Sequence, residues 1–216
     1  LLEVAREAGV KTIVYLSTLD VFGFGAGTVN AQTPIRASDP YQSSKVSAEK
    51  VLLDFAGKNA VPRVVVIRAA RAIGSRDSTL AVPLLRMITS HRVVLPRSSE
   101  MSFTHPKDIA QAMYRAAANE ALPGGVYLIK SFDSSPEDLA KELAKAVGIP
   151  AAVRRAGFLS RPELPRYTAR QLEASLRLAP QANWKTVEYS PEYDLEKTCA
   201  EIASWYKKEP WVTEQA

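Results

Sequence analysis

Two pairs of side chains in this sequence have the types and the spacing that proton transfer requires. Tyr41 and Lys45 stand four positions apart, and in a helix this spacing puts the phenol and the ammonium on one face. A phenol with an ordinary pKa of about 10 transfers protons slowly at neutral pH, but a nearby cation favours its phenolate form. Ser17 and Thr18 supply hydroxyls that could bind a substrate oxygen while the tyrosine moves the proton. Both pairs also have an ordinary interpretation: Tyr41 and Lys45 as exposed helix residues, and Ser17 and Thr18 as residues that end a strand. They can act together only if the fold brings them close in space.

The apolar pattern predicts the elements that would position these side chains. Residues 12–16 and 64–67 are continuous β-branched and apolar runs, as expected for strands that are buried on both faces of a parallel sheet. Residues 23–40 predict a loop, and residues 41–56 predict a helix. Strand, loop, helix and strand in this order predict a doubly wound α/β sheet. Such sheets bind ligands at the carboxyl ends of their strands, which is where the hydroxyls of the first strand stand.

The rest of the chain continues this alternation. Apolar spacing and helix-start residues predict further helices over residues 1–8, 83–90, 106–118, 135–147 and 195–207. A short strand is predicted over residues 126–129. Residues 149–183 are basic and contain prolines, and their periodicity predicts no regular element.

The composition is that of a folded, water-soluble chain. Of its 216 residues, 46% are hydrophobic and 24% are charged, which excludes a disordered, coiled-coil or collagen-like protein. The net charge of +5 is spread along the chain and suits a small anionic ligand at least as well as nucleic acid. A single cysteine, Cys199, forms no internal disulfide, and two histidines are too few for a histidine-rich metal site. We found neither a long apolar run nor a signal peptide, and we predict a cytoplasmic protein with no metal and no membrane segment.

Five motifs lie in a fixed order along nearly the whole chain. They are VYLSTLDVFG, YQSSKVSAEK, VVVIRAARAIG, FTHPKDIAQAM and GGVYLI. Together they resemble the extended short-chain dehydrogenase/reductases, the NAD-dependent epimerase/dehydratase group. The resemblance implies an α/β fold made of the C-terminal half of a doubly wound Rossmann-type parallel sheet and a small α/β substrate-binding domain. The implied domains are the catalytic half of the Rossmann domain, residues 1–74 and 103–131, and the substrate-binding domain, residues 75–102 and 132–216.

The resemblance also implies roles for single residues. Thr18 matches the catalytic hydroxyl, which also contacts the substrate, and Tyr41 matches the catalytic acid/base. Lys45 matches the lysine that bonds the nicotinamide ribose and lowers the pKa of the tyrosine. The positions expected to contact the cofactor, NAD or NADP, are Ser17, Tyr41, Lys45, Arg68 and Ala69. In such enzymes a hydride moves between the nicotinamide ring and a carbinol carbon while the tyrosine moves the proton.

Three more residues fit the family pattern but have simpler interpretations. Glu49 stands one helical turn after Lys45, so we expect it to form an i, i+4 salt bridge with that lysine. His105 and Asp108 begin the helix that returns to the Rossmann domain. There the helix dipole by itself favours an acidic residue in the first turn.

Departures from the family pattern limit which reaction and which substrate the chain can have. Members that dehydrate nucleotide sugars place an acidic pair directly after the catalytic threonine, and the pair here is Leu19-Asp20. Because leucine cannot transfer protons, we predict that the chain is not a 4,6-dehydratase. Arg71 stands where many nucleotide-sugar members have Asn. It could bind a phosphate or carboxylate of the substrate, or it could be a structural or solvated arginine.

The glycine turn that holds the pyrophosphate of a dinucleotide is absent from this sequence. Residues 23–27 are rich in glycine, but they follow the catalytic strand and precede no helix start, so we interpret them as an active-site loop. The chain also begins at Leu1, inside a helical pattern and without a methionine. We therefore expect that the N-terminal half of the Rossmann domain is missing from the chain as given.

These inferences predict an NAD(P)-dependent epimerase or carbonyl reductase that acts on a sugar nucleotide or a related hydroxyl or carbonyl compound. The substrate would be small and anionic. The chain would form a homodimer through the helix of Tyr41 and its neighbour, as is common in the family. The alternative is a non-catalytic relative that serves as a binding or assembly module, against which the intact Thr18, Tyr41 and Lys45 argue. Nucleic-acid binding through the arginines of residues 154–177 is a weaker third possibility, because the aromatic residues there form no stacking array. Nothing in the sequence distinguishes an epimerase from a reductase.

Overall fold

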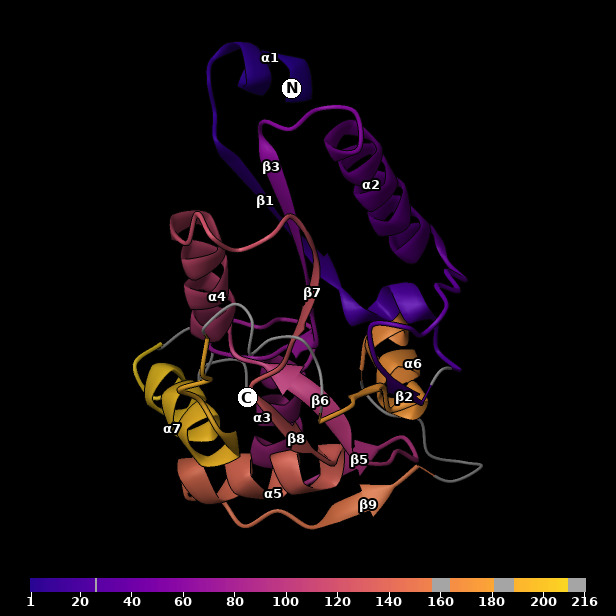
Figure 1. Cartoon of the computed structure of the whole chain (residues 1–216). Helices are drawn as coiled ribbons and strands as arrows, with labels where there is room; N and C mark the ends of the chain where they lie inside the picture. The colour runs from indigo at the N-terminus through magenta and orange to yellow at the C-terminus, as the bar shows by residue number, and fades with distance from the viewer. Residues whose placement is uncertain (26, 157–163, 181–188, 210–216) are drawn as a thin grey trace.

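The protein combines a parallel sheet with a second group of helices and short strands (Figure 1). The computed structural model describes residues 1–25, 27–156, 164–180 and 189–209. The helices are α1 (Leu2–Glu7), the short 3-10 helix η1 (Leu19–Phe22), α2 (Pro40–Ala56), α3 (Ala81–Thr89), α4 (Pro106–Ala118), α5 (Pro136–Val147), α6 (Arg166–Ala174) and α7 (Leu195–Tyr206). The strands are β1 (Thr12–Thr18), β2 (Thr28–Val29), β3 (Arg63–Ala69), β4 (Arg71–Ala72), β5 (Val93–Leu95), β6 (Met101–Thr104), β7 (Gly125–Ile129), β8 (Phe132–Ser134), β9 (Val153–Arg155) and β10 (Arg177–Leu178).

The main sheet consists of β1, β3 and β7 in that order, and all three strands are parallel. In the register of the sheet, Thr18 lies opposite Ala69, and Ala69 lies opposite Ile129. The strands therefore end at one edge, where parallel sheets bind their ligands. β1 extends beyond the predicted residues 12–16, so that Ser17 and Thr18 are its last residues. The parallel pairing confirms the predicted α/β class.

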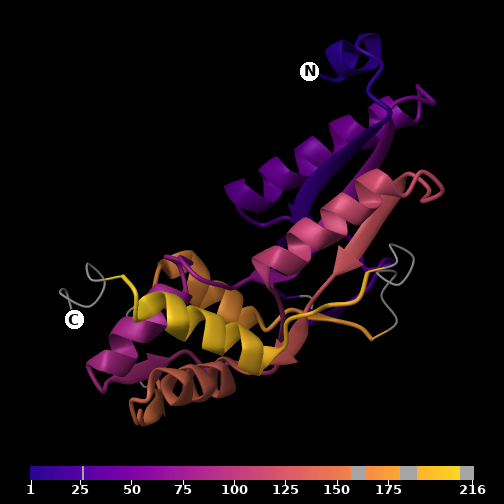
Figure 2. The same ribbon diagram turned by 90° about the vertical axis from the view of Figure 1, so that its left-hand side faces the viewer.

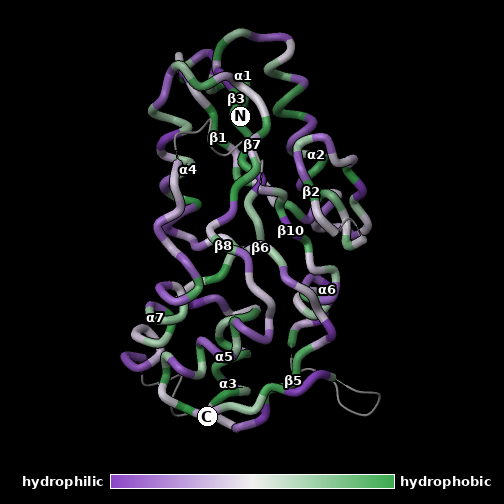
Figure 3. Tube along the Cα trace, turned by 60° about the horizontal axis from the view of Figure 1, so that its bottom comes forward, coloured by the Kyte–Doolittle hydropathy of each residue, from purple (hydrophilic) through white to green (hydrophobic). Residues whose placement is uncertain are grey.

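Helices α2 and α4 cover the two faces of this sheet, and the strands run between them (Figure 2). Side chains of a strand alternate between its two faces. In β3, Val64 and Val66 belong to the apolar cluster on the α2 side, whereas Val65 and Ile67 belong to the cluster on the α4 side. All four are at most 1% exposed. Burial on both faces explains why the strand is apolar throughout rather than alternating, which is also visible as the green tube of the main sheet in Figure 3.

A second apolar core lies among α3, α5 and α7, below the sheet in Figure 1. Its centre is formed by side chains that are fully buried, among them Leu84, Leu139, Leu143 and Ile202. The small sheet β4-β6-β8 joins this core to the main sheet, and it draws its strands from both predicted domains. The predicted division of the chain into two domains stays a prediction.

The predicted helices are all present, but the short elements differ from the prediction. Residues 23–40, predicted as a loop, contain β2, which pairs in parallel with β10. Residues 149–183, predicted to be irregular, contain β9, α6 and β10. These strands are two or three residues long, too short to show a period. Each is stabilised by a partner that is distant in the sequence, so local patterns could not predict them.

Candidate active site

A cavity of about 660 Å³ opens at the carboxyl ends of β1 and β3. Its lining includes Ser17 and Thr18 from β1, Tyr41 and Lys45 from α2, and Ala69 from β3. The structure therefore brings together the residues predicted to carry the chemistry. They come from three separate elements that meet at the edge of the sheet.

Helix α2 presents Tyr41 and Lys45 to this cavity from its first turns. Pro40 occupies the first helical position, and the carboxylate of Asp39 accepts a hydrogen bond from the backbone N–H of Gln42 at 3.0 Å. These are the features that start a helix. The ammonium of Lys45 donates to the carbonyl oxygen of Leu16 at 3.1 Å and lies 5.9 Å from the centre of the Tyr41 ring. The predicted common face of the two side chains is thus present.

The surroundings of Tyr41 raise its pKa above the ordinary value. Partial burial is the largest cause, and the charge of Asp20 is the next. The resemblance implied a pKa lowered by Lys45, whereas the surroundings of Tyr41 in this chain shift its pKa in the opposite direction. Tyr41 is therefore held as a neutral phenol.

Thr18 has two contacts that follow from its place at the end of β1. Its side-chain oxygen accepts a hydrogen bond from the backbone N–H of Asp20 at 3.1 Å and so caps η1. Its side chain also lines the cavity. The loop that follows the strand is thereby fixed directly beside the candidate hydroxyl.

The structure corrects one expectation behind this edge of the sheet and gives the Arg68 side chain a partner. Arg68 does not line the cavity, and its guanidinium forms a buried, bidentate ion pair with Glu49, with Nη2 2.6 Å from Oε2. The expected i, i+4 salt bridge between Glu49 and Lys45 is therefore wrong. Glu49 is 2% exposed and also accepts a hydrogen bond from the hydroxyl of Ser17. Of the residues predicted to contact the cofactor, Arg68 has its guanidinium occupied by this ion pair, which gives its side chain a structural role.

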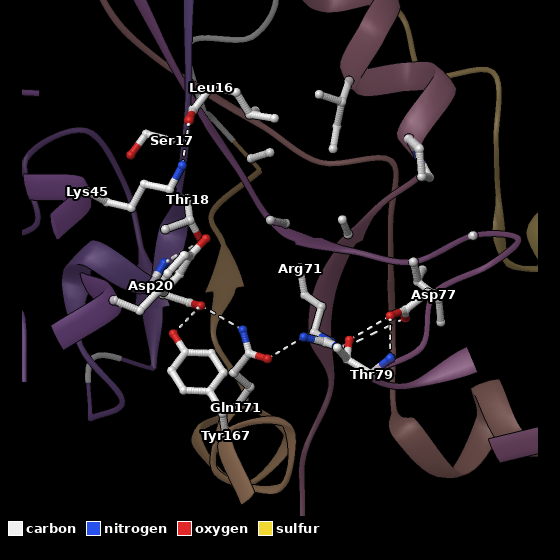
Figure 4. Close-up of a pocket in the computed structure, with 18 of the residues that line it drawn as sticks. Leu16, Ser17, Thr18, Asp20, Lys45, Arg71, Asp77, Thr79, Tyr167 and Gln171 are labelled. Carbon is white, nitrogen blue, oxygen red and sulfur yellow. Dashed lines mark hydrogen bonds and ion pairs between the residues drawn. The ribbon is translucent and has the colours of Figure 1, made fainter. Parts of the chain in front are cut away.

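Arg71 lines the opposite wall of the cavity and lies among polar partners (Figure 4). Its Nη2 donates to the hydroxyl of Thr79 at 2.7 Å, its Nη1 donates to the side-chain oxygen of Gln171, and Asp77 lies 3.8 Å away. The third nitrogen, Nε, is buried and has no hydrogen-bond partner among the residues that the structure describes. Arg71 is thus partly neutralised by its neighbours, and its Nε is unpaired within the described part of the chain.

The sequence did not reveal Asp20, Tyr167 and Gln171 as members of the site. The carboxylate of Asp20 lines the cavity and accepts hydrogen bonds from the hydroxyl of Tyr167 at 2.9 Å and from the side-chain N–H of Gln171 at 2.6 Å (Figure 4). Burial raises the pKa of Asp20 above its ordinary value. The i, i+4 spacing of Tyr167 and Gln171 was the one available signal, and it lies in the segment predicted to be irregular. None of the described arginines in residues 154–177 lines this cavity.

His105 and Asp108 have structural roles at the start of α4. The imidazole Nδ1 of His105 accepts a hydrogen bond from the backbone N–H of Lys107, and its ring stacks on Tyr193 with 3.6 Å between centroids. Asp108 accepts hydrogen bonds from the hydroxyl of Ser131 and from a backbone N–H of the segment before α7. Both residues therefore have the expected structural role at the start of α4. Their contacts also attach the segment before α7 to this helix.

Among the described residues, no group of three or more His, Cys, Asp or Glu side chains is placed to hold a metal ion. In the same parts of the chain, none of the helices has the length and the apolar character that crossing a lipid bilayer requires.

The chain is similar to known proteins in both sequence and structure. It is 27% identical over 157 residues to dTDP-D-glucose 4,6-dehydratase of Mus musculus. The aligned region covers 68% of this chain and 43% of that protein. It is 32% identical over 80 residues to UDP-glucose 4-epimerase of Erwinia amylovora, covering 36% of this chain and 24% of that protein. The chain thus spans less than half the length of these relatives.

Solved structures show the same fold at low sequence identity. UDP-glucuronic acid 4-epimerase from Bacillus cereus, in complex with NAD, superimposes with a TM-score of 0.78 at 19% identity, over 96% of this chain and 65% of that one. RMD from Pseudomonas aeruginosa, complexed with NADPH, gives a TM-score of 0.74 at 19% identity, over 97% and 70%. The model of the NAD dependent epimerase/dehydratase family matches residues 1–129. By that match, and in agreement with its five motifs, the chain belongs to the NAD dependent epimerase/dehydratase family.

Proposed function

We propose that this chain carries the proton-transfer residues of an NAD(P)-dependent epimerase or carbonyl reductase. The observation that carries the proposal is the meeting of Thr18, Tyr41 and Lys45, from two separate elements, in one cavity at the carboxyl end of the sheet. The family and the sugar-nucleotide epimerases among its relatives support a sugar nucleotide or a related hydroxyl or carbonyl substrate. The predicted homodimer and the predicted cytoplasmic location stay predictions.

Each of the three residues has a distinct part in the proposed reaction. The phenol of Tyr41 gives a proton to the substrate oxygen when a carbonyl is reduced and takes it back when a hydroxyl is oxidised. The hydroxyl of Thr18 donates a hydrogen bond to the same oxygen. Lys45 uses one of its three ammonium protons on the carbonyl oxygen of Leu16, which leaves two for a ligand.

The residues present fit a nicotinamide cofactor. Ala69, Ala70 and Ala72 line the same cavity as Lys45 with small side chains, which leave room for a flat ring. When bound, the nicotinamide ring would supply or accept the hydride, and Lys45 would hold its ribose. A cationic ring next to Tyr41 would also favour the phenolate, against the burial that raises the pKa of the phenol here.

The proposal does not include dehydration, although the relatives of this chain include 4,6-dehydratases. Leu19 is 2% exposed and has no group that transfers protons, and the carboxylate of Asp20 is engaged by two side chains of α6. The family resemblance implies acidic residues at both positions of this pair in a dehydratase.

The substitution Tyr41→Phe in the protein that contains this chain tests the proposal. The expected result is a fall in turnover of about a hundredfold to ten-thousandfold, the usual contribution of a proton-transfer residue, while NAD(H) still binds. Binding is followed by nicotinamide fluorescence and turnover by nicotinamide absorbance. The mechanism is wrong if Tyr41→Phe leaves turnover unchanged, and failure of the unchanged protein to bind NAD(H) would favour a non-catalytic binding module instead.

A further inference from the structure

Asp20 connects both candidate proton-transfer positions to helix α6. Its backbone N–H donates to the side-chain oxygen of Thr18 at 3.1 Å. Its carboxylate oxygen Oδ2 accepts from Tyr167 at 2.9 Å and from Gln171 at 2.6 Å, and the side chain of Asp20 is almost completely buried. The residue therefore holds a bond to Thr18 on one side and to α6 on the other (Figure 4).

Helix α6 is attached at the cavity by this contact, together with the burial of its Leu172 in the second apolar core. The helix has no side-chain cap at its N-terminus. Tyr167 and Gln171 stand one turn apart on it, and Gln171 also accepts a hydrogen bond from Arg71 through its side-chain oxygen. The buried amide of Gln171 thus has both its N–H and its oxygen bonded within the wall of the cavity.

Tyr167 in turn contacts Tyr41. Their rings meet edge to face, with 5.7 Å between centroids and an angle of 82° between the planes. Phe24 packs on Tyr167 in a similar way at 5.4 Å. Tyr41 is 45% exposed, and the Tyr167 ring and the ammonium of Lys45 both lie against its ring, where they can limit the direction of the phenol.

We propose that Asp20 is a positioning residue for Tyr41: its carboxylate holds Tyr167, and the ring of Tyr167 fixes the orientation of the Tyr41 phenol in the cavity. The inference rests on the proposed function only in that Tyr41 is the group that transfers the proton. Two donors on one oxygen of a buried carboxylate make a stronger attachment than neutral hydrogen bonds would, because hydrogen bonds to a charged group are the stronger kind. The negative charge of the same carboxylate also disfavours the phenolate form of Tyr41.

Several other groups face Tyr41, and they determine what a change at Asp20 can show. Tyr15 and Asp39 also disfavour the phenolate, whereas Arg71 favours it. Lys45 lies beneath the ring. All of these groups remain when Asp20 is changed, so a difference in the titration of Tyr41 reports the loss of the Asp20 charge and any movement of the phenol relative to them.

The first test uses Tyr167→Phe, which keeps the ring and removes the hydroxyl donor. The buried carboxylate then has one donor fewer, and we expect amide hydrogen exchange in α6 to become about tenfold faster while α5 is unchanged. The NMR signal of the Tyr41 ring should move as well, and since Tyr167→Phe retains the aromatic ring, such a change reports a new orientation. The matched control is Tyr114→Phe, at a residue that is 73% exposed.

The second test uses Asp20→Asn with isotope-labelled tyrosine, whose ring-carbon signal follows the ionisation of each phenol. The Tyr41 signal is the one lost in Tyr41→Phe. We expect the Tyr41 phenol to ionise at a lower pH in Asp20→Asn than in the unchanged protein, and to be unaffected by Asp54→Asn, the same change at an exposed site.

Any one of three results would overturn the proposal. They are an amide exchange rate in α6 that Tyr167→Phe leaves unchanged, a Tyr41 ring signal that does not move in that variant, and a Tyr41 titration that is not shifted in Asp20→Asn. None of these measurements needs substrate, cofactor or turnover. A failure of the proposed function would appear as absent turnover or absent NAD(H) binding, and is therefore distinguishable from a failure of this inference.

Discussion

Arg68 of β3 and Glu49 of α2 form a buried ion pair directly behind the cavity, with Nη2 2.6 Å from Oε2 and side chains that are 7% and 3% exposed. The pair attaches the helix that carries Tyr41 and Lys45 to the central strand of the sheet. Glu49 also accepts a hydrogen bond from the hydroxyl of Ser17, so that one carboxylate connects α2 with both β1 and β3. The position of the candidate proton-transfer residues depends on this connection.

Glu49→Gln should therefore destabilise the protein strongly. The variant leaves the Arg68 guanidinium buried without its counter-charge, and breaking a buried pair in this way costs about 3–5 kcal/mol. The free energy of unfolding in urea measures the loss. The exposed pair of Lys50 and Asp54, with Nζ 2.7 Å from Oδ2, provides the control, since Asp54→Asn should cost less than about 1 kcal/mol. Equal losses in the two variants would contradict the assigned importance of the buried pair.

Arg71→Lys should weaken the binding of an anionic substrate while NAD(H) binding is kept. Lysine retains the positive charge but cannot reproduce the fork of donors that reaches Thr79 and Gln171 and whose Nε has no partner among the described residues. We expect KM to rise about tenfold or more, with a smaller change in kcat. Arg76→Lys is the control, because Arg76 lines the same cavity with a side chain that is 79% exposed. If Arg71→Lys lowers only the stability and not the affinity, Arg71 is a structural arginine.

Gly23→Ala should distort the loop that follows η1. Gly23 has a φ of +80°, and an added Cβ would lie 2.4 Å from the backbone oxygen of Arg36. Strained backbone of this kind costs about 1–3 kcal/mol, and the close contact adds to it. Thermal unfolding would measure the loss. Gly25→Ala, where an added Cβ meets no atom within 4 Å, should change the stability far less, and a similar loss in both variants would argue against this explanation.

Stability should decrease as the pH falls below about 6.5 because of His105. Burial lowers the pKa of His105 below its ordinary value of 6.5, although Glu201 and Asp108 oppose this shift. The unfolded chain then binds a proton at a pH where the folded chain does not, so protons favour unfolding. This contribution is present above pH 6.5 and is lost as the pH falls through the lowered pKa.

His105→Asn tests this dependence, because asparagine can still cap α4 but does not titrate. Urea unfolding at pH 7.5 and pH 5.5 should show a smaller loss of stability on acidification in His105→Asn than in the unchanged protein. The exposed His91 supplies the control substitution His91→Asn. An acid loss of the same size in His105→Asn and in the unchanged protein would show that other groups are responsible.

Much of the fold followed from local patterns in the sequence. The buried strand around Val64–Ile67 and the helix that begins before Tyr41 were predictable, because burial on two faces and the i, i+4 period leave their mark on neighbouring residues. The same spacing placed Tyr41 and Lys45 on one face, and the end of β1 placed Thr18 at the edge where ligands bind. These inferences depend only on residues that are close in the sequence.

The tertiary structure decided which distant residues became partners. Glu49 bonds Arg68 rather than Lys45, and Asp20 bonds Tyr167, which lies in a segment without a recognisable period. β2 likewise exists because β10 pairs with it. A buried charge must find a counter-charge or hydrogen-bond donors when the chain packs, and several candidates satisfy that need equally in the sequence. The sequence by itself therefore determined the elements and the local placement of the proton-transfer residues, whereas packing between distant segments decided what holds them in position.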